Sequence, residues 1–271
     1  MLFEGFVYIC GVFFFCFFGK KNRPLCFITI YLTQMSIEIN GIDYELEKMK
    51  DLPYVLEKAY KYVQKIGWER ATASQKFIRH IHIYIALSLV EIGIPEDNIQ
   101  FETKLQNKNV DLCIFKDKKP FLVISIKSQS SSIRKNFTNS ANALQGEAAS
   151  LKSSYSDLKV ATFMLYKETD VVENVNCKNY YIEKIPLKVL PIIVPMYNSP
   201  QKFDNGCLVL WDNTATGIQI EETNTLFKEF GVIPFFAWIK NVYEGKEITS
   251  QFSAKDISTK IADFLTDEKI G

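Results

Sequence analysis

The sequence predicts an α/β domain in which a mixed β-sheet is flanked by helices. Two stretches, 54–66 and 74–92, carry apolar residues at helical spacing. Three apolar stretches of strand length come next, and a third helical stripe and another apolar strand follow them: 99–105, 110–115, 121–127, 140–155 and 160–166. The chain between residues 74 and 166 therefore has the predicted order helix, three strands, helix, strand.

Residues at the ends of these stretches support the assignments. Pro53 precedes the first helix, a position where the fixed φ angle of proline is tolerated. Gly93 and Pro95 end the second helix. The apolar stripe of the second helix consists of Ile78, Ile81, Ile85 and Leu89, and that of the third consists of Ala141, Leu144, Ala148, Leu151 and Tyr155.

The C-terminal part of the chain, residues 170–271, has a weaker pattern. Residues 185–196 carry three prolines, which favours an edge strand or an extended wall over a central strand. The apolar stretches 207–211 and 232–239 are expected to be buried. A capping-box-like start at 253–256 predicts a last amphipathic helix. We expect residues 35–271 to form one domain whose C-terminal part contributes to recognition of a ligand.

Residues 1–34 form an apolar leader that holds eight of the 21 phenylalanines. A signal peptide is disfavoured because Glu4 precedes the apolar run and the lysines follow it. A single membrane anchor stays open, although the uncharged run 5–19 is shorter than the ~20 residues that span a bilayer. We favour a third interpretation, in which Met35 is the natural start. Mass spectrometry of the natural protein tests it, because a peptide from residues 13–20 would contradict it.

Composition bounds the class of protein. Of the 271 residues 47% are apolar, which is enough for a sizeable core. A net charge of +1 neither indicates nor excludes a protein that binds nucleic acid, because local patches matter more than the sum. One basic patch is present, in which Asp117 is the single acid among Lys116, Lys118, Lys119, Lys127, Arg134 and Lys135. Six cysteines without a CxxC pair are typical of a reduced, cytoplasmic protein, and we expect no stable membrane association.

Several catalytic systems are disfavoured by the sequence. The two histidines, His80 and His82, are spaced i,i+2 on a predicted helix, so they do not face each other. That spacing argues against a histidine-rich metal site and against a Ser-His-Asp triad. The chain contains no P-loop and no dinucleotide-binding glycine motif.

A predicted hairpin concentrates polar side chains on one face of the sheet. Residues 116–120 form a polar connection between two predicted strands. If the hairpin is centred on Lys118, Asp111 lies opposite Ser125, and Lys127 shares the face of Ser125. These three side chains would then converge at one spot. In the alternative interpretation the strand emerges into water at Lys127, and Asp111 is its surface counter-ion.

These residues resemble the motif of the PD-(D/E)xK nuclease superfamily. Asn109-Val-Asp111, thirteen further residues and Ser125-Ile-Lys127 match its spacing, and the predicted element order matches its core. The stretch IKSQSSS…KNFTN…ALQGEA is similar to what several type II restriction endonucleases show after the motif lysine. The resemblance implies a restriction-endonuclease-like core over about 74–166, with Asp111 as a metal ligand and Lys127 as the catalytic lysine. Ser125 departs from the pattern, because the family has an acid there.

The missing acid bears on the implied Mg²⁺ site. Magnesium is typically held by one or two carboxylates, together with phosphate and water oxygens. In some restriction enzymes of the superfamily a serine also occupies the strand position, and a Glu on the following helix supplies the charge. Glu147 is the candidate for that role here. Glu102 and Glu91 are weaker candidates, and the resemblance adds the main-chain carbonyl of Ile126 as a ligand.

The polar stretch 128–139 is predicted to be a loop that contacts DNA. Its side chains are of the kinds that hydrogen-bond to phosphates and base edges. The candidate DNA-binding residues are Gln129, Ser130, Ser131, Ser132, Arg134, Lys135, Asn136 and Asn139. In the alternative interpretation this stretch is a flexible surface loop.

The sequence thus predicts a type II restriction endonuclease that uses Mg²⁺ to cut double-stranded DNA at a short specific sequence. A homodimer is expected, since a two-fold symmetric protein matches a palindromic site. Two alternatives stay open. One is another nuclease of the superfamily, for repair or junction resolution, and the other is a catalytically inactive DNA-binding module, which Ser125 makes plausible.

Overall fold

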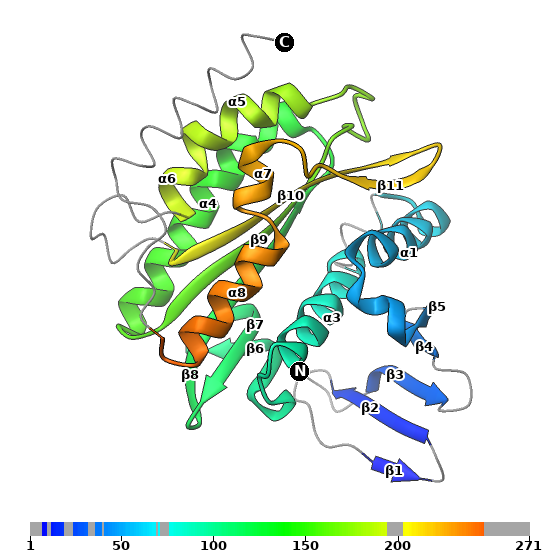
Figure 1. Ribbon diagram of the computed structural model, residues 1–271, viewed down its shortest axis with the longest axis vertical. Helices are drawn as coiled ribbons and strands as arrows, with labels where there is room; N and C mark the ends of the chain where they lie inside the picture. The colour runs from blue at the N-terminus through cyan, green and yellow to red at the C-terminus, as the bar shows by residue number, and fades with distance from the viewer. Residues whose placement is uncertain are drawn as a thin grey trace. The chain divides into compact units, whose positions relative to one another are not determined.

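The computed structural model of the chain describes residues 7–9, 12–18, 24–31, 36–39, 41–68, 70, 76–193 and 203–246 (Figure 1). Side chains are described from Glu38 onward, with Leu46 excepted. None of the helices in this part of the chain is both long and apolar enough to cross a membrane.

The described residues form two β-sheets. The first has five antiparallel strands in chain order: β1 (Val7–Ile9), β2 (Val12–Phe18), β3 (Pro24–Tyr31), β4 (Ser36–Ile39) and β5 (Ile42–Glu45). The second is an open sheet of six strands, in the order β11-β10-β9-β8-β7-β6. Its strands are β6 (Ile99–Leu105), β7 (Lys108–Lys116), β8 (Lys119–Gln129), β9 (Lys159–Lys167), β10 (Asn205–Thr214) and β11 (Gly217–Ile220). This sheet is mixed, because β9 pairs in parallel with β8 and β10, whereas β6 and β7 are antiparallel.

The helices lie between groups of strands and after the last strand along the chain. The α-helices are α1 (Leu52–Ile66), α3 (Lys76–Glu91), α4 (Ile133–Ser154), α5 (Lys178–Lys188), α6 (Leu190–Ile193), α7 (Thr225–Glu229) and α8 (Val232–Tyr243). Two 3-10 helices, η1 (Leu46–Lys50) and η2 (Glu96–Asn98), precede α1 and β6. The chain divides into two compact units: one holds residues 1–115 and 213–218, and the other holds 116–212 and 219–271.

The core of the first unit forms where α1, α3 and β5 meet. Tyr44 of β5 is fully buried and hydrogen-bonded to Nδ1 of His80 on α3. Burial lowers the pKa of His80 to about 4, so this histidine is a neutral core residue. The ring of His82 stacks on Phe101 of β6, with 5.9 Å between the ring centroids. Both histidines are thus buried core residues that contact aromatic rings.

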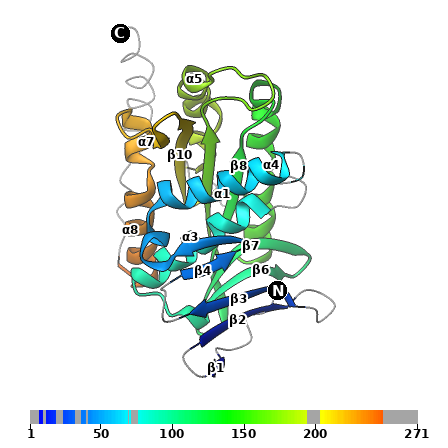
Figure 2. The same cartoon turned by 90° about the vertical axis from the view of Figure 1, so that its right-hand side faces the viewer.

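The second unit is layered. Helices α7 and α8 lie on one side of strands β8–β10, and α4 and α5 lie on the other side (Figure 2). Strand β9 is buried and mostly apolar from Val160 to Tyr166, with Thr162 as the polar exception, and it contributes side chains to both layers. Phe163 packs against Phe235 of α8 at 5.7 Å between ring centroids, and Tyr166 packs against Tyr181 of α5 at 4.7 Å. A parallel strand covered on both faces needs such a nearly continuous apolar run.

The predicted core elements are present in the predicted order. Helix α3, strands β6, β7 and β8, helix α4 and strand β9 follow one another along the chain. The buried stretches 207–211 and 232–239 fall in β10 and α8. Strands β1, β2 and β3 lie within the predicted leader. The predicted helix at 253–256 lies outside the described residues.

The prediction of an edge or extended wall at 185–196 is wrong for its described part, which is helical. Pro191 stands at the second position of α6, where a proline costs no intrahelical hydrogen bond. Pro186 lies inside α5, whose apolar side chains Ile182 and Ile185 are buried. Gly206 of β10 makes room for α6, because a Cβ at Gly206 would lie 2.9 Å from Cδ1 of Ile193. Tertiary burial therefore outweighs the local preference of the prolines.

Helix α4 begins seven residues earlier than predicted, at Ile133 instead of Ser140. Its start is fixed by Asp170, a buried residue that follows β9. The carboxylate of Asp170 accepts hydrogen bonds from the backbone amides of Ile133, Val172 and Glu173 at 2.7, 2.8 and 3.0 Å. Burial raises the pKa of Asp170, but these amides and that of Ser132 outweigh it and hold the pKa below its usual value.

Replacing Asp170 by asparagine is expected to lower the free energy of unfolding by about 1.5–3 kcal/mol at pH 7, the usual range for hydrogen bonds to a charged group. The pKa of this group is lower in the folded than in the unfolded chain. Its contribution is therefore present above the unfolded pKa of about 3.9 and is lost as the pH falls through the folded pKa. Urea unfolding of both proteins at decreasing pH checks this. A difference between them that does not shrink in acid would point to packing instead of charge.

Candidate active site

The connection between β7 and β8 is a tight turn. It consists of Asp117 and Lys118 alone, whose φ angles are +51° and +62°. Two successive left-handed residues are typical of a type I′ turn, whose twist suits a two-residue hairpin. The predicted five-residue connection is therefore too long, because Lys116 and Lys119 belong to the strands. A turn centred between Asp117 and Lys118 means that the predicted pairing of Asp111 with Ser125 requires an irregular position in the ladder.

Lys127 lies near the carboxyl end of β8 and contacts α4. Its Nζ lies 3.3 Å from Oε2 of Glu147, which α4 presents beside its buried stripe. The side chain of Lys127 is 42% exposed and that of Glu147 is 21% exposed. The structure thus brings together two of the residues singled out in the sequence, from positions 20 apart in the chain. Lys127 is a partly accessible cation beside a mostly covered carboxylate.

Ser125 lies inside the same layer. Its side chain is fully buried, and its Oγ has no hydrogen-bond partner among the described residues. Residues two apart on a strand point to the same face, so Ser125 and Lys127 both face α4. The main-chain carbonyl of Ser125 accepts a hydrogen bond from Thr162 Oγ1 on β9 at 3.1 Å. A buried hydroxyl without a hydrogen-bond partner lowers the free energy of unfolding, so a functional reason for a serine at this position is worth considering.

Ile126, the middle residue of the motif, is also buried. It pairs with Phe163 of β9 in the parallel ladder. The strand thus holds the main chain of the motif between two neighbours, which gives Ser125 and Lys127 fixed directions.

Asp111 belongs to the first unit, where it is half-buried on β7. The β6–β7 ladder pairs Phe101 with Leu112 and Thr103 with Val110. Glu102 and Asp111 lie between these two pairs, one on each strand. The backbone of Glu102 is left-handed, with a φ of +41°, at this point of the ladder. The two acidic residues therefore occupy neighbouring positions on adjacent strands.

The two weaker ligand candidates are engaged by cations elsewhere. Glu102 Oε1 accepts a hydrogen bond from Arg79 Nε of α3 at 3.2 Å. Glu91 Oε1 lies 2.8 Å from Lys50 Nζ. Glu147 differs from both because its cation is the motif lysine itself.

A magnesium site can draw on few donors in the second unit. Glu147 supplies one carboxylate and Ser125 one hydroxyl with unused hydrogen-bonding capacity. The single carboxylate meets the lower limit of what Mg²⁺ usually takes, which is one or two carboxylates with phosphate and water oxygens in its other positions. Within the described ranges, no three His, Cys, Asp or Glu side chains are grouped so that they could share an ion.

The residues predicted to contact DNA lie in three successive segments: the end of β8, an irregular link and the start of α4. Gln129 ends β8, and its Nε2 donates to the carbonyl of Ile133 at 3.2 Å. Ser130, Ser131 and Ser132 form a short link. The others lie in the first two turns of α4 and are exposed: Arg134, Lys135, Asn136 and Asn139. The prediction of a loop across 128–139 is therefore wrong, because Asp170 caps a helix that begins at Ile133.

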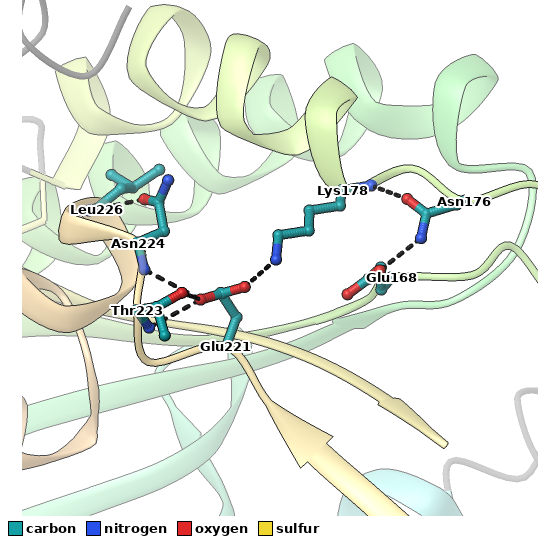
Figure 3. A network of polar contacts seen from close by, with 7 residues as sticks. All are labelled: Glu168, Asn176, Lys178, Glu221, Thr223, Asn224 and Leu226. Carbon is teal, nitrogen blue, oxygen red and sulfur yellow. Dashed lines mark hydrogen bonds and ion pairs between the residues drawn. The ribbon is translucent and has the colours of Figure 1, made fainter. Parts of the chain in front are cut away.

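A polar network beside α5 was not evident from the sequence. Glu221 accepts hydrogen bonds from Thr223 and from the amide of Asn224, and it pairs with Lys178 at the start of α5 (Figure 3). Burial raises the pKa of Glu221, but Lys178, Thr223 and the amides lower it to about 2. Asn176 accepts from the amide of Lys178 at 2.9 Å and donates to Glu168. The Lys178–Glu221 contact joins positions 43 residues apart, so no local pattern indicates it.

A mostly buried charge pair joins the ends of β9 and β10. Lys167 of β9 pairs with Asp212 of β10, and Thr169 donates to the same carboxylate. The ammonium group of Lys167 also lies 5.5 Å from the ring centroid of Trp211. The described cysteines, Cys113, Cys177 and Cys207, are buried free thiols. Burial raises the pKa of the Cys113 thiol to about 12, which makes it a poor nucleophile.

Comparisons with models of known protein families, with curated proteins and with solved structures find no match to this chain.

Proposed function

We propose that the chain is a type II restriction endonuclease with a restriction-endonuclease-like core. It would hydrolyse phosphodiester bonds in double-stranded DNA at a short specific sequence, with Mg²⁺ as cofactor. The observation that carries the proposal is the Lys127–Glu147 pair. A motif lysine at the end of a core strand and the acid of the following helix lie 3.3 Å apart, beside the serine that replaces the strand acid.

The side chains of the site would have different roles in the reaction. Lys127, being partly exposed, can reach a water molecule and stabilise it as it loses its proton. Glu147 and the carbonyl of Ile126 would hold the ion, and the resemblance adds Asp111 as a further ligand. When bound, Mg²⁺ polarises a phosphoryl oxygen and offsets the charge that develops on it. The mostly covered Glu147 is held by Lys127 before any ion arrives, which spares the site an unpaired carboxylate.

The exposed side chains of α4 would meet the DNA. Arg134 and Lys135 supply positive charge for phosphates, and Asn136 and Asn139 supply amide groups that can donate and accept. A homodimer would place two such sites on the two strands of a palindrome.

A second candidate function is a catalytically inactive DNA-binding module. Ser125 favours it, since a buried hydroxyl is a weaker magnesium ligand than the carboxylate that the family has there. This candidate keeps the polar face of α4 and predicts no cleavage.

A plasmid digest separates these functions. We expect the full chain, incubated with supercoiled plasmid DNA and Mg²⁺, to produce discrete fragments, and to produce none when EDTA replaces the metal. Nicks or a smear would point to another nuclease, for repair or junction resolution. DNA binding in a gel-shift assay without cleavage under any divalent metal would support the inactive module and would contradict the endonuclease.

A further inference from the structure

We propose that Tyr180 of α5 is a positioning residue for DNA binding, because it holds Arg134 of α4 in place to contact a backbone phosphate. This inference rests on the proposed function, in which the first turns of α4 meet DNA. It adds to that function a residue outside the motif and outside the polar stretch 128–139.

The outer face of α4 has the charge that a phosphate requires. Arg134 and Lys135 are exposed, and Glu147, near the far end of the helix, is the single acid of α4. Within the described part of the chain, neither Arg134 nor Lys135 forms an ion pair. Neither charge is therefore neutralised by an acid, although the side chain of Arg134 also interacts with that of Cys177.

The N-terminus of α4 cannot itself receive the phosphate. Free amides at a helix start commonly bind anions. Here the carboxylate of Asp170 already occupies that place, with its Oδ2 2.7 Å from the amide nitrogen of Ile133. A phosphate that approaches this end of α4 must therefore be met by side chains.

Tyr180 contacts Arg134 at two points. The guanidinium carbon of Arg134 lies 5.9 Å from the centroid of the Tyr180 ring, within range of a cation–π interaction. The hydroxyl of Tyr180 donates to the main-chain carbonyl of Arg134 at 3.4 Å. The ring thus restrains the guanidinium group of Arg134, and the hydroxyl binds the main chain of the same residue. No comparable aromatic support is present for Lys135 among the described residues.

Tyr180 is itself firmly held. Its ring packs edge-on against Phe137, with 5.7 Å between the centroids. It stands in the first turn of α5, and the network of Figure 3 fixes that turn through Asn176, Lys178 and Glu221. With these contacts in place, Tyr180 can restrict the long arginine side chain before DNA arrives. This restriction lowers the entropy that must be lost on binding.

The expected effect is modest and specific. Loss of an exposed cation–π contact corresponds to about a two- to five-fold change in Kd. Tyr180→Leu keeps apolar contact with Phe137 and should weaken DNA binding by about that factor, whereas Tyr180→Phe keeps the ring and should bind nearly as the parent does. The charge of Arg134 remains in both variants. The salt dependence of binding should therefore stay unchanged, whereas Arg134→Ala should flatten its log–log slope by about one unit.

A double-mutant cycle tests the coupling with the full chain and a labelled mixed-sequence duplex in EDTA, which prevents cleavage. In the Arg134→Ala background, Tyr180→Leu should have no further effect on Kd. In the matched Lys135→Ala background, it should retain its two- to five-fold effect. Thermal unfolding checks that each variant is folded, and Tyr180→Met serves in place of Tyr180→Leu if the latter is not.

The outcomes distinguish the positioning role of Tyr180 from DNA binding by the chain. If Tyr180→Leu weakens binding equally in the Arg134→Ala and Lys135→Ala backgrounds, or not at all, the positioning role is wrong while DNA binding stands. A parent chain that binds no duplex at any salt concentration overturns both.

Discussion

Replacing Lys127 by alanine is expected to slow magnesium-dependent DNA cleavage by about 10²–10⁴-fold, the usual contribution of a group that assists proton transfer. Binding of DNA should change little, because the ammonium group is proposed to serve the attacking water and lies beside Glu147 instead of in the exposed face of α4. Single-turnover cleavage and a gel shift with the same duplex measure the two effects separately.

The chain offers a closely matched control. Lys159, at the start of β9, has a side chain that is 46% exposed, and its Nζ lies 3.5 Å from Asp204. Lys127 and Lys159 thus have similar exposure and similar ion pairs, and each pair is worth about 0–1 kcal/mol of stability. Lys159→Ala should cleave normally. If the two alanine variants cleave at the same rate, Lys127 has no catalytic role and the proposed nuclease loses its main support.

Replacing Glu147 by alanine is expected to abolish magnesium-dependent cleavage as fully as Asp111→Ala does. Either change leaves one carboxylate to hold the ion, which is the minimum for a magnesium site. Glu102→Ala and Glu91→Ala should remain active, since their carboxylates pair with Arg79 and Lys50. Cleavage by all four variants is compared in one assay with varied Mg²⁺. An active Glu147→Ala together with an inactive Glu102→Ala would place the second carboxylate on β6.

The strand offers a way to restore the missing charge. Ser125→Glu combined with Glu147→Ala places the acid where the wider superfamily has it, two residues before Lys127 on the same face. This double variant should recover measurable activity, though less than the parent, because the surrounding contacts suit the other arrangement. Ser125→Glu alone should be weaker than the parent or altered in its metal preference. It buries another carboxylate at a fully covered position, where burial and like-charge repulsion raise its pKa.

The periodic parts of the chain are determined by the sequence alone. The stripes in α1 and α3 and the apolar runs of β6, β8 and β9 identify those elements to within a few residues, because burial of one face imposes its period on the residues. The same patterns predict the order of elements and hence a mixed sheet flanked by helices.

Sequence reasoning singled out Lys127 from the predicted hairpin and Glu147 from a resemblance, and the structure brings these two side chains together. It missed Tyr180 and Asp170. An aspartate just after an apolar strand is a weak signal by itself, although strand ends of this kind often carry functional side chains. Tyr180 has no signal in the sequence, because its spacing fits a core residue equally well.

Where contacts join distant segments, only the tertiary structure determines the local conformation and which side chains meet. The polar stretch 128–139 becomes helical from Ile133 because Asp170, 37 residues away, satisfies the free amides at its start. The proline-rich stretch from 185 is helical because its apolar side chains are buried against the sheet and Gly206 makes room for Ile193. Lys127 contacts Glu147 because the chain turns after β8 and α4 then packs on the face of the strand to which Ser125 and Lys127 point. In each case the decisive free energy comes from burial or charge pairing across the fold, which local sequence does not encode.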